Sequence, residues 1–298
     1  MPHDITFIGH VCLDRIAPYQ GQEQVAPGSA VLCGAMAAAR IGCRTAVITR
    51  MAPADDGYLD PLRAAGVDCL LVPAPATTEM IVIHPSPDVD EREMRQVKNA
   101  GFMQADEIPT LDSRFVHLAG ITDREFDLPF MRAMRQRGYS LSVDMQSFVR
   151  QVDEDSRVIS FADVADKAAI VSLMDRVKLD VVEAEILTGQ RDLARAAAMV
   201  ADWGCPEVVI TRADGVLARV EGRTLFSPFT NRSTVGRTGR GDTTFAGYMA
   251  RRLSEDPAEA LRFASALVSL KMERPGPFAG TLDDVLERLR ETTVEEQA

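Results

Sequence analysis

Positive charge is scarce in this sequence. Its 298 residues include 33 Lys and Arg against 44 Asp and Glu, which gives a formal net charge of −11. The basic residues are scattered, and no segment gathers them into a long run. Proteins that bind nucleic acid or anionic membranes usually concentrate basic charge on one surface. The composition therefore argues against both partners, although a small anionic ligand held by a loop and single arginines is compatible with it.

Histidines, cysteine pairs and long apolar runs are also rare or missing. The four histidines have no metal-ligand spacing, and the five cysteines, an odd number, include no Cys-x-x-Cys motif. Cysteines in apolar runs are typical of core residues in a reducing compartment. No run approaches the ~20 apolar residues that cross a bilayer, and the first residues lack the basic and apolar segments of a signal peptide. We therefore expect a cytoplasmic protein without membrane association.

Two common nucleotide motifs are missing as well. The sequence has no Gly-x-x-x-x-Gly-Lys-Ser/Thr, which excludes a P-loop enzyme, and no early glycine fingerprint of a dinucleotide-binding unit. A different glycine loop lies late in the chain, as Gly236-Arg237-Thr238-Gly239-Arg240-Gly241-Asp242. The residues that follow, 245–253, carry apolar side chains at helical spacing, which predicts that the loop opens a helix.

A glycine loop that opens a helix favours an anion site, because unpaired backbone N–H groups lie at the positive end of the helix dipole. A carboxylate beside such a site repels the anion, so Asp242 needs another explanation. It fits a base that takes a proton from a hydroxyl while the loop holds a phosphoryl group in transfer. Glycine turns before helices are common, so the loop alone supports an ordinary helix start equally well.

Most of the chain alternates short buried strands with amphipathic helices. Strands are predicted at residues 5–9, 46–49, 115–118, 140–143, 177–181 and 208–211, and helices at 30–41 and 58–65. This alternation predicts an α/β fold with a mainly parallel sheet and helices on both faces. Ligands of such sheets bind beyond the carboxyl ends of the strands, where Asp14, Asp144 and Asp180 are expected.

Two stretches interrupt the alternation. Residues 13–25 follow the first strand without entering a helix, and residues 69–71 and 80–84 look like strands that pair with each other. We expect these pieces to form a small β layer over one edge of the main sheet. The layer is either a lid that keeps water from a reaction or an ordinary edge hairpin. The polar residues 85–93 follow it, and the polar tail 291–298 is expected to be frayed.

These features together resemble the ribokinase-like (PfkB) carbohydrate kinase family, from residue 5 to about residue 289. The family has its glycine loop and catalytic Asp late in the chain, close to Asp-Thr-x-Gly-Ala-Gly-Asp, and this chain keeps the Gly-x-Gly-Asp core. The resemblance implies that Asp242 is the catalytic base and that the backbone N–H groups of Gly239, Arg240 and Gly241 form an anion hole. It also implies a single kinase domain over residues 1–298, a three-layer α/β/α sandwich with a lid from about 12–27 and 69–105.

Two early segments resemble the substrate site of the family. Asp14 ends the segment that looks like the first strand, and it would bind substrate. The segment from Gly28 to Cys33 looks like the Gly-Gly-x-x-x-Asn substrate motif, with Ser29 in place of the second Gly and Cys33 in place of the Asn. A thiol is a poor substitute for an amide that both donates and accepts hydrogen bonds. The resemblance therefore implies that substrate recognition differs from that of ribokinase.

Two later segments resemble the donor site of the family. Asp180 and Glu183 match its Asn-x-x-Glu segment, which organises magnesium and phosphate through water. Asp180 replaces the Asn, which keeps an oxygen ligand and adds a negative charge. Thr211, Asp214 and Gly215 match the turn that lies against the nucleotide. The resemblance therefore assigns the metal to Glu183 and the nucleotide to the other four residues.

The glycine loop itself departs from the family pattern. Gly236 replaces its first Asp, and Arg240 stands where Ala is frequent. Arg237 and Arg240 either contact a phosphoryl group or an acidic group of the substrate, or are solvated structural residues. Asp144 and Arg150 fall near an element that lies close to the phosphates in the family. The loop, together with residues 271–277, looks like a branch of the family loosely linked to cyclitols such as myo-inositol.

The resemblance thus implies a kinase that uses ATP and Mg²⁺ to phosphorylate a hydroxyl of a small sugar, sugar acid or cyclitol. The family varies in its need for a monovalent cation, and Gly236 lies close to the region involved. The edge of the β layer also offers a surface through which two chains would pair, so a homodimer through the lid is expected.

Two other functions stay open. A non-catalytic ligand-binding protein on the same fold would explain the substituted motif positions, although it has no need of an intact Gly-x-Gly-Asp. A nucleoside kinase of the same family would need a substrate site lined by aromatic side chains. The chain has one Trp and four Tyr, and few aromatic residues lie near Asp14 or Cys33 in the sequence.

Overall fold

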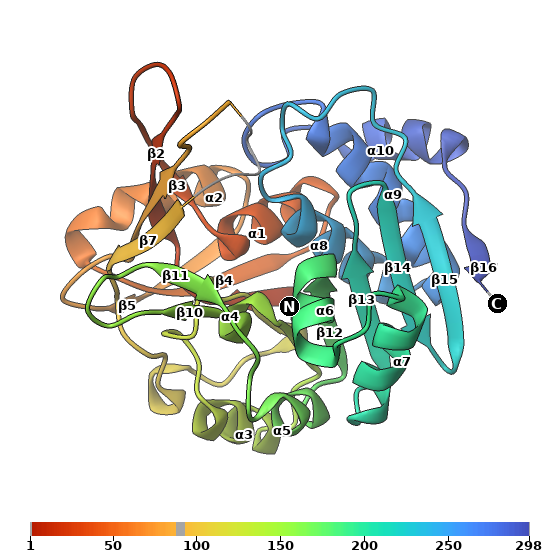
Figure 1. The fold of residues 1–298 in the computed structure, drawn as a ribbon, viewed down its shortest axis with the longest axis horizontal. Helices are drawn as coiled ribbons and strands as arrows, with labels where there is room; N and C mark the ends of the chain where they lie inside the picture. The colour runs from red at the N-terminus through yellow and green to blue at the C-terminus, as the bar shows by residue number, and fades with distance from the viewer. Residues whose placement is uncertain (1, 88–92, 298) are drawn as a thin grey trace.

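The computed structural model describes residues 2–87 and 93–297. Its centre is a ten-stranded sheet with the order β16-β15-β14-β13-β12-β9-β8-β1-β4-β5 (Figure 1). Neighbouring strands from β5 to β13 run parallel, whereas β14, β15 and β16 extend the sheet in antiparallel order. The strands are β1 (His3–Ile8), β4 (Thr45–Met51), β5 (Asp68–Pro73), β8 (Ser113–Leu118), β9 (Leu141–Asp144), β12 (Arg176–Asp180), β13 (Glu207–Thr211), β14 (Gly215–Val220), β15 (Arg223–Pro228) and β16 (Glu295–Gln297).

Helices pack on both faces of this sheet because successive strand residues point to opposite faces. Phe7 belongs to one hydrophobic cluster and the next residue, Ile8, to the other. The first cluster includes residues of α1 (Ala30–Arg40), α2 (Asp60–Ala64), α8 (Arg240–Arg252), α9 (Pro257–Met272) and α10 (Leu282–Arg288). The second includes residues of α3 (Leu128–Gln136), α4 (Gln146–Val149), α5 (Lys167–Ser172), α6 (Val181–Thr188) and α7 (Leu193–Asp202). The predicted three-layer arrangement is therefore confirmed.

A second sheet of four strands has the order β3-β2-β6-β7 and forms the lid. Its strands are β2 (Cys12–Ala17), β3 (Gln24–Gly28), β6 (Glu79–Ile83) and β7 (Glu93–Lys98). Figure 1 shows it beside α1 and α2, at the end of the main sheet away from the C-terminus. Residues 88–92 of the predicted polar stretch lie outside the described residues.

The predicted pairing of residues 69–71 with 80–84 is wrong. Residues 69–71 belong to β5, which pairs in parallel with β4 at the edge of the main sheet, so the lid does not begin there. Residues 80–83 lie in β6, which pairs with β2 and β7. A short apolar run predicts that a strand exists but does not specify its partner, and proximity in the sequence was misleading in this case.

The expectation of a frayed tail is wrong for its last described residues. Residues 295–297 form β16, which pairs antiparallel with β15 through Phe226, Leu225 and Thr224. The edge of β15 offers unpaired backbone groups, which a polar segment satisfies without burying its side chains. The predicted helix at 58–65 is also shorter, because a 3₁₀ turn at Pro53–Leu59 precedes α2.

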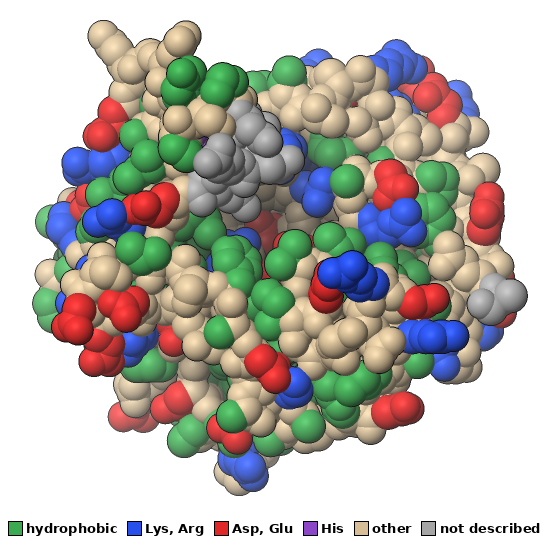
Figure 2. All heavy atoms as spheres, viewed as in Figure 1, with side chains coloured by type: hydrophobic (Ala, Val, Ile, Leu, Met, Phe, Trp, Pro, Cys, Tyr) green, Lys and Arg blue, Asp and Glu red, His purple; other side chains and the backbone are tan. Residues whose placement is uncertain are grey.

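The parallel register brings the candidate residues together at the carboxyl ends of the strands in the main sheet. β12 pairs with β9 on one side and β13 on the other, so the strand ends at Asp144, Asp180 and Thr211 adjoin. Figure 2 shows this face hollowed near its centre, with acidic and basic side chains inside the hollow. Among the described residues, no helix combines the length and apolar character needed to cross a membrane.

Candidate active site

The glycine loop opens α8 and places Asp242 in the first turn of the helix. Gly239 is the N-cap with φ of 77°, a left-handed conformation that glycine adopts without strain. A side chain at Gly239 would also meet Sγ of Cys33 at 2.5 Å, and one at Gly236 would collide with a backbone carbonyl oxygen that follows α9. Glycine is therefore needed in the loop for both conformation and space.

The three amides predicted to form an anion hole differ in availability. The N–H of Arg240 donates to the carbonyl oxygen of Arg237 at 3.1 Å, so this amide departs from the expectation. The N–H groups of Gly239 and Gly241 make no hydrogen bond within residues 2–87 and 93–297. Burial, together with the like charge of Arg237, lowers the pKa of the Arg240 guanidinium. A bound anion would therefore offset the cost of burying the Arg240 guanidinium and would accept from two amides.

A buried ion pair packs against the loop. Nζ of Lys178 on β12 donates to Oδ2 of Asp144 on β9 at 2.8 Å, with side-chain exposures of 4% and 1%. A side chain on Gly241 would meet this Nζ at 2.9 Å, so the ammonium lies directly against the loop backbone. Burial alone lowers the pKa of Lys178, but Asp144, followed by Glu183 and Asp242, raises it overall. The loop is thus backed by a permanent positive charge.

Asp180 and Glu183 form the capping box of α6. Oδ1 of Asp180 accepts from the N–H of Glu183 at 2.9 Å, and Oε2 of Glu183 accepts from the N–H of Asp180 at 2.7 Å. The other carboxylate oxygen, Oε1 of Glu183, is buried without a partner among the described residues. Burial raises the pKa of Glu183 to about 8, opposed by Lys178. An unpartnered buried carboxylate oxygen next to a second carboxylate fits a hard cation such as Mg²⁺.

No group of three or more His, Cys, Asp or Glu side chains that could hold a metal is found in the described part of the chain. Mg²⁺ commonly keeps several waters and binds through one or two carboxylates plus substrate phosphates. Glu183 and Asp180 therefore suit Mg²⁺ that is carried mainly by a phosphate donor.

Three of the residues predicted to bind the nucleotide lie at the turn between β13 and β14, where Thr211 pairs with Val216 and the N–H of Arg212 donates to the carbonyl oxygen of Gly215 at 2.8 Å. Thr211 is buried at the end of β13, and its Oγ1 would lie 3.6 Å from a side chain on Gly241, so it belongs to the loop region. Asp214 lies in the following turn and forms a bidentate pair with Arg212, both contacts at 2.8 Å. Gly215 begins β14 with the ring of Phe226 against it. Thr211 therefore borders the glycine loop, whereas the side chain of Asp214 is engaged with Arg212.

Asp14 lies on lid strand β2, next to the first helix. Gly28, on the neighbouring β3, leaves room for it, because a side chain there would collide with Oδ2 of Asp14. The thiol of Cys12 donates to Oδ1 of Asp14 at 3.2 Å. Burial raises the pKa of Asp14, opposed by the Cys12 hydrogen bond and by the charge of Arg150. This carboxylate keeps most of its acceptor capacity for a ligand.

Ser29 and Cys33 begin and line the first helix. Ser29 is the N-cap of α1, and its Oγ accepts from the N–H of Leu32 at 3.2 Å. Its φ of 129° lies in the region that favours glycine, the residue that the resembled motif has at this position. Cys33 is buried, and burial, followed by Asp242, raises the pKa of its thiol to about 12. Cys33 lies against Gly239, so the first turn of α1 borders the glycine loop that precedes Asp242.

A model of the "pfkB family carbohydrate kinase" matches residues 2–283. The chain belongs to the pfkB family of carbohydrate kinases. It is similar to a curated relative, the cytidine kinase of Thermococcus kodakarensis, at 27% identity over 260 residues, or 83% of this chain and 87% of the relative. These kinases transfer a phosphoryl group to a hydroxyl, so this protein is a phosphotransferase.

Two solved structures are similar to this pfkB family kinase over nearly its whole length. A sulfate complex of a pyrophosphate-dependent kinase in the ribokinase family is 30% identical, has a TM-score of 0.88 and covers 95% of this chain and 99% of that one. A pyrophosphate-dependent kinase complexed with a pyrophosphate analogue and myo-inositol is 28% identical, has a TM-score of 0.86 and covers 95% and 99%. The ribokinase-like fold and the link of this branch to cyclitol kinases are thereby confirmed.

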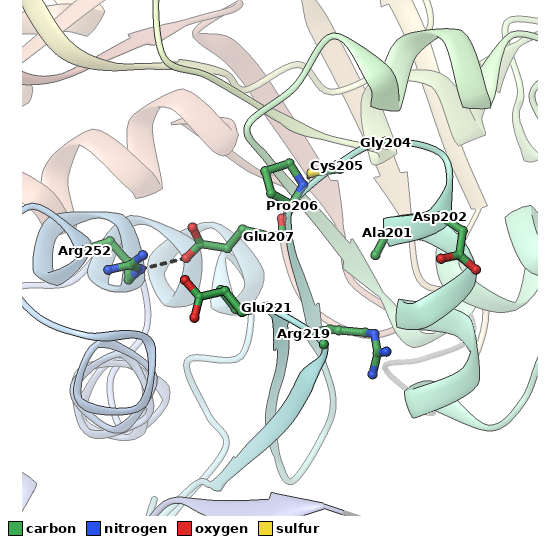
Figure 3. A pocket seen from close by; sticks show the side chains of 11 residues that line it. Ala201, Asp202, Gly204, Cys205, Pro206, Glu207, Arg219, Glu221 and Arg252 are labelled. Atoms are coloured by element: carbon green, nitrogen blue, oxygen red, sulfur yellow. Dashed lines mark hydrogen bonds and ion pairs between the residues drawn. The ribbon is translucent and has the colours of Figure 1, made fainter.

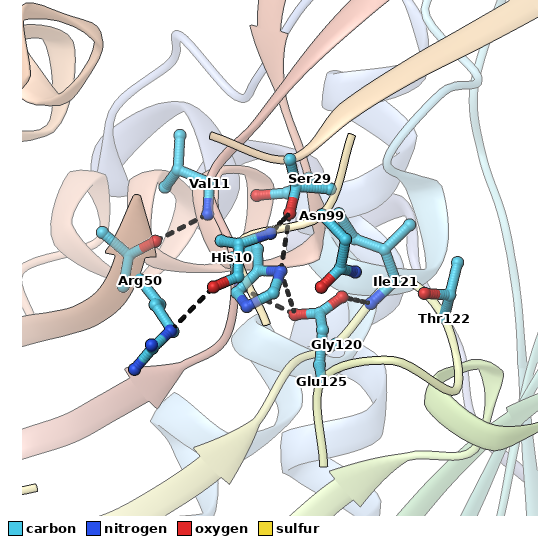
Figure 4. A network of polar contacts seen from close by, with 12 residues as sticks. His10, Val11, Ser29, Arg50, Asn99, Gly120, Ile121, Thr122 and Glu125 are labelled. Carbon is cyan, nitrogen blue, oxygen red and sulfur yellow. Dashed lines mark hydrogen bonds and ion pairs between the residues drawn. The ribbon is translucent and has the colours of Figure 1, made fainter. Parts of the chain in front are cut away.

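A buried polar network fixes the start of the lid in this kinase (Figure 4). Nε2 of His10 donates to the carbonyl oxygen of Gly101 at 3.0 Å, so Nδ1 accepts from the hydroxyl of Thr78 at 2.8 Å. Glu125 accepts from the N–H of His10 at 2.8 Å and from that of Ile121 at 2.6 Å. Burial lowers the pKa of His10, which keeps it neutral. The network joins the end of β1 to the segments flanking β6 and β7, which positions the lid.

A surface cavity of about 540 Å³ lies at the opposite ends of the strands, where β13 begins (Figure 3). It is lined by Glu207, which begins β13, whereas the candidate site lies where β13 ends. Glu207 already accepts hydrogen bonds from Tyr248 and from Arg252. The cavity is therefore separate from the candidate kinase site, and its Glu207 is already engaged within the protein.

Two lysines near the active site were missed by sequence analysis. Lys178 lies inside a buried strand, and Lys271 on the buried face of α9 donates to carbonyl oxygens of Gly236 and Thr238. A charged residue within an apolar strand was a usable signal for Lys178, because it needs a partner such as Asp144 on a neighbouring strand. The contact of Lys271 with a distant loop left no local signal.

Proposed function

We propose that this kinase phosphorylates a hydroxyl of a small polyol, with a cyclitol such as myo-inositol as the first candidate. Asp242 supports this proposal most strongly, because it stands in the first turn of α8 beside the amides of Gly239 and Gly241, which have no partner in the described part of the chain. Cys33 of α1 lies against Gly239 of the loop, and Asp14 lies against Gly28, which precedes the N-cap of α1. The proposed base and the proposed hydroxyl acceptor therefore both adjoin the start of α1. That arrangement suits a substrate with several hydroxyls.

In the proposed mechanism, Asp14 accepts hydrogen bonds from hydroxyls of the polyol and fixes its orientation. Asp242 takes the proton of the attacking hydroxyl as its oxygen bonds to the transferred phosphorus. The bond between that phosphorus and the leaving phosphate oxygen breaks. The amides of Gly239 and Gly241 donate to the oxygens on which negative charge gathers. Lys178 adds a positive charge behind the loop.

Magnesium, when bound, supplies charge neutralisation on the donor phosphates. Oε1 of Glu183 and the carboxylate of Asp180 would hold it, directly or through water. Both groups are already fixed by the capping box of α6, so little reorganisation is required of them.

The family resemblance implied ATP as the donor. Pyrophosphate is proposed instead. Arg237 and Arg240 add two guanidinium groups to the loop, which suits a donor that is entirely phosphate. Asp214 forms an exposed bidentate pair with Arg212, so its carboxylate is already engaged in the turn expected to meet a nucleotide. The two similar solved structures are pyrophosphate-dependent kinases, which adds support.

A donor and acceptor panel tests the proposal. Purified protein with Mg²⁺ is given either pyrophosphate or ATP, together with cyclitols, sugars, sugar acids and nucleosides, and the phosphorylated product is measured. We expect product with pyrophosphate and a cyclitol. Product with ATP alone would overturn the donor assignment. A clear preference for cytidine or adenosine would favour the nucleoside kinase alternative, which the cytidine kinase relative supports. Polyol binding without product under every condition would favour the non-catalytic alternative.

A homodimer through the lid is also proposed. The β2–β3 hairpin at the lid edge exposes two large apolar side chains, Tyr19 at 51% and Val25 at 58%. Val25 lies on the edge strand β3 and Tyr19 in the turn before it, and exposed apolar groups at a sheet edge favour pairing with another chain. Light scattering of the wild type and of a Tyr19→Ser/Val25→Ser variant tests this. We expect a dimer that the double substitution weakens, and a monomeric wild type would exclude it.

A further inference from the structure

Lys271 makes two hydrogen bonds that hold the glycine loop. Its Nζ donates to the carbonyl oxygens of Gly236 and Thr238. The N–H of Gly236 donates in turn to the carbonyl oxygen of Met272 at 2.8 Å. The loop is therefore bonded to the end of α9 through the N–H and the carbonyl group of Gly236 and through the carbonyl group of Thr238.

The ammonium group of Lys271 is enclosed. The side chain is 2% exposed, and no salt bridge with a carboxylate is found for it in the described residues. Burial lowers its pKa, whereas Cys33 and Asp242 act to raise it. A buried cation without an ion-pair partner is costly, so its persistence depends on the two carbonyl dipoles that face it.

Two carbonyl oxygens that converge on one buried point would repel each other without a cation between them. A bare monovalent cation bound there would satisfy them by coordination, whereas Lys271 satisfies them by donated hydrogen bonds. The space beside Gly236 is also filled, because a side chain there would meet the carbonyl oxygen of Lys271 at 2.8 Å. The covalently attached ammonium therefore occupies the position that a free ion would need.

We propose that Lys271 is a built-in monovalent cation, which holds the loop before α8 in its anion-binding form so that the kinase works without K⁺ or Na⁺. Lys271 is a positioning residue, because it contacts the loop backbone and transfers no proton. The proposal rests on the phosphoryl transfer of the family but not on the choice of donor or polyol. It answers the question of monovalent-cation need that the sequence left open.

The wild-type protein provides the first measurement. Thermal unfolding is followed in K⁺, Na⁺ and tetramethylammonium chloride at equal ionic strength. We expect the same Tm in all three salts, because the carbonyl groups are already satisfied. A Tm, or kinase activity where a substrate pair is known, that rises specifically with K⁺ or Na⁺ would overturn the proposal. Because the Tm requires no substrate, a wrong choice of donor or polyol leaves this result intact.

The Lys271→Met variant provides the second measurement. Removing the ammonium leaves two facing carbonyls and a loop free to shift, and a displacement of about 1 Å near the chemistry costs roughly 10²-fold in activity. We expect a lower Tm and activity, and partial recovery of both in K⁺ or NH₄⁺ but not in tetramethylammonium, which is too large to enter. A folded variant that responds equally to all three salts would overturn the cation role. If the variant does not fold, the wild-type salt comparison still decides.

Lys167→Met is a matched control. Lys167 also donates to a helix carbonyl oxygen, that of Leu187, at 2.7 Å, but it lies on α5 and pairs with Asp163. Its loss is expected to leave the salt response unchanged. A K⁺-specific recovery in this variant would show that the recovery is not particular to the loop, and would count against the proposal.

Discussion

The donor side and the polyol side of the site are built differently. On the donor side, buried charges satisfy one another across neighbouring elements of the main sheet, as Lys178 does with Asp144. On the proposed polyol side, one carboxylate, Asp14, stands on the lid and accepts from the thiol of Cys12. The reaction chemistry is thus fixed by strand register in a rigid sheet. In the proposed function, substrate choice would depend on a second sheet and on weakly polar groups, which are easier to change without loss of the fold.

The largest effect is expected from Asp242→Asn on the donor side. The amide keeps the size of the side chain but cannot accept the hydroxyl proton, so turnover should fall roughly 10²–10⁴-fold. Polyol affinity, measured by calorimetry, should change little because Asp14 is untouched. Near-normal turnover in an active preparation would show that another group is the base.

Breaking the buried ion pair comes next. Lys178→Met leaves Asp144 as an uncompensated buried charge, so the free energy of unfolding, measured with urea, should fall by about 3–5 kcal/mol. The lid offers a control, because Lys98 pairs with Glu79 at 2.7 Å but is 59% exposed. Lys98→Met should cost less than about 1 kcal/mol. Equal losses in the two variants would remove the contrast between the two sides.

Glu183→Gln should weaken the binding of Mg²⁺ at the proposed site while leaving α6 intact. Glutamine keeps an oxygen that accepts from the N–H of Asp180, so the helix start survives. The Mg²⁺ concentration for half-maximal rate should rise about 10–100-fold. An unchanged Mg²⁺ dependence would place the metal elsewhere.

The same variant has a pH signature in metal-free protein. Burial raises the pKa of Glu183 from 4.5 to about 8, so the folded state favours the protonated form. This contribution to stability is complete below pH 4.5 and is lost as the pH rises toward 8. The stability of Glu183→Gln should therefore fall less than that of the wild type over this range, as urea unfolding at several pH values would test.

On the polyol side, Asp14→Asn should raise the KM for the polyol about 10–100-fold, the value of a hydrogen bond to a charged group. Burial raises the pKa of Asp14, so in the wild type the carboxylate protonates above the usual range of an Asp. The KM should therefore rise as the pH falls through that raised pKa, and Asp14→Asn should flatten this dependence. A wild-type KM that is constant on acidification would argue against a direct contact.

The same contrast explains how far the sequence could be interpreted. The loop at 236–242 and the pair Asp180 and Glu183 are local patterns, because a helix start and its capping residues are close in the chain. The pairing of β5 with β4 and the contact of Lys271 with the loop depend on residues far apart in the chain, so no local pattern shows them. The use of the Arg240 amide by Arg237 is a detail of loop conformation that the glycine spacing does not determine.

Cys33→Ser should give the smallest effect. Burial raises the pKa of this thiol to about 12, so it is neutral and a weak hydrogen-bond donor at working pH. A serine hydroxyl donates and accepts more strongly, and a neutral hydrogen bond contributes about 0.5–1.5 kcal/mol, so the KM for the polyol should fall about 2–10-fold. Cys205→Ser, also buried but bonded to the carbonyl oxygen of Glu207 at the far edge of the sheet, should leave the KM unchanged. Cys33 also packs against Gly239 of the loop. A large loss of activity in Cys33→Ser would therefore mean that the polyol side tolerates no more change than the donor side.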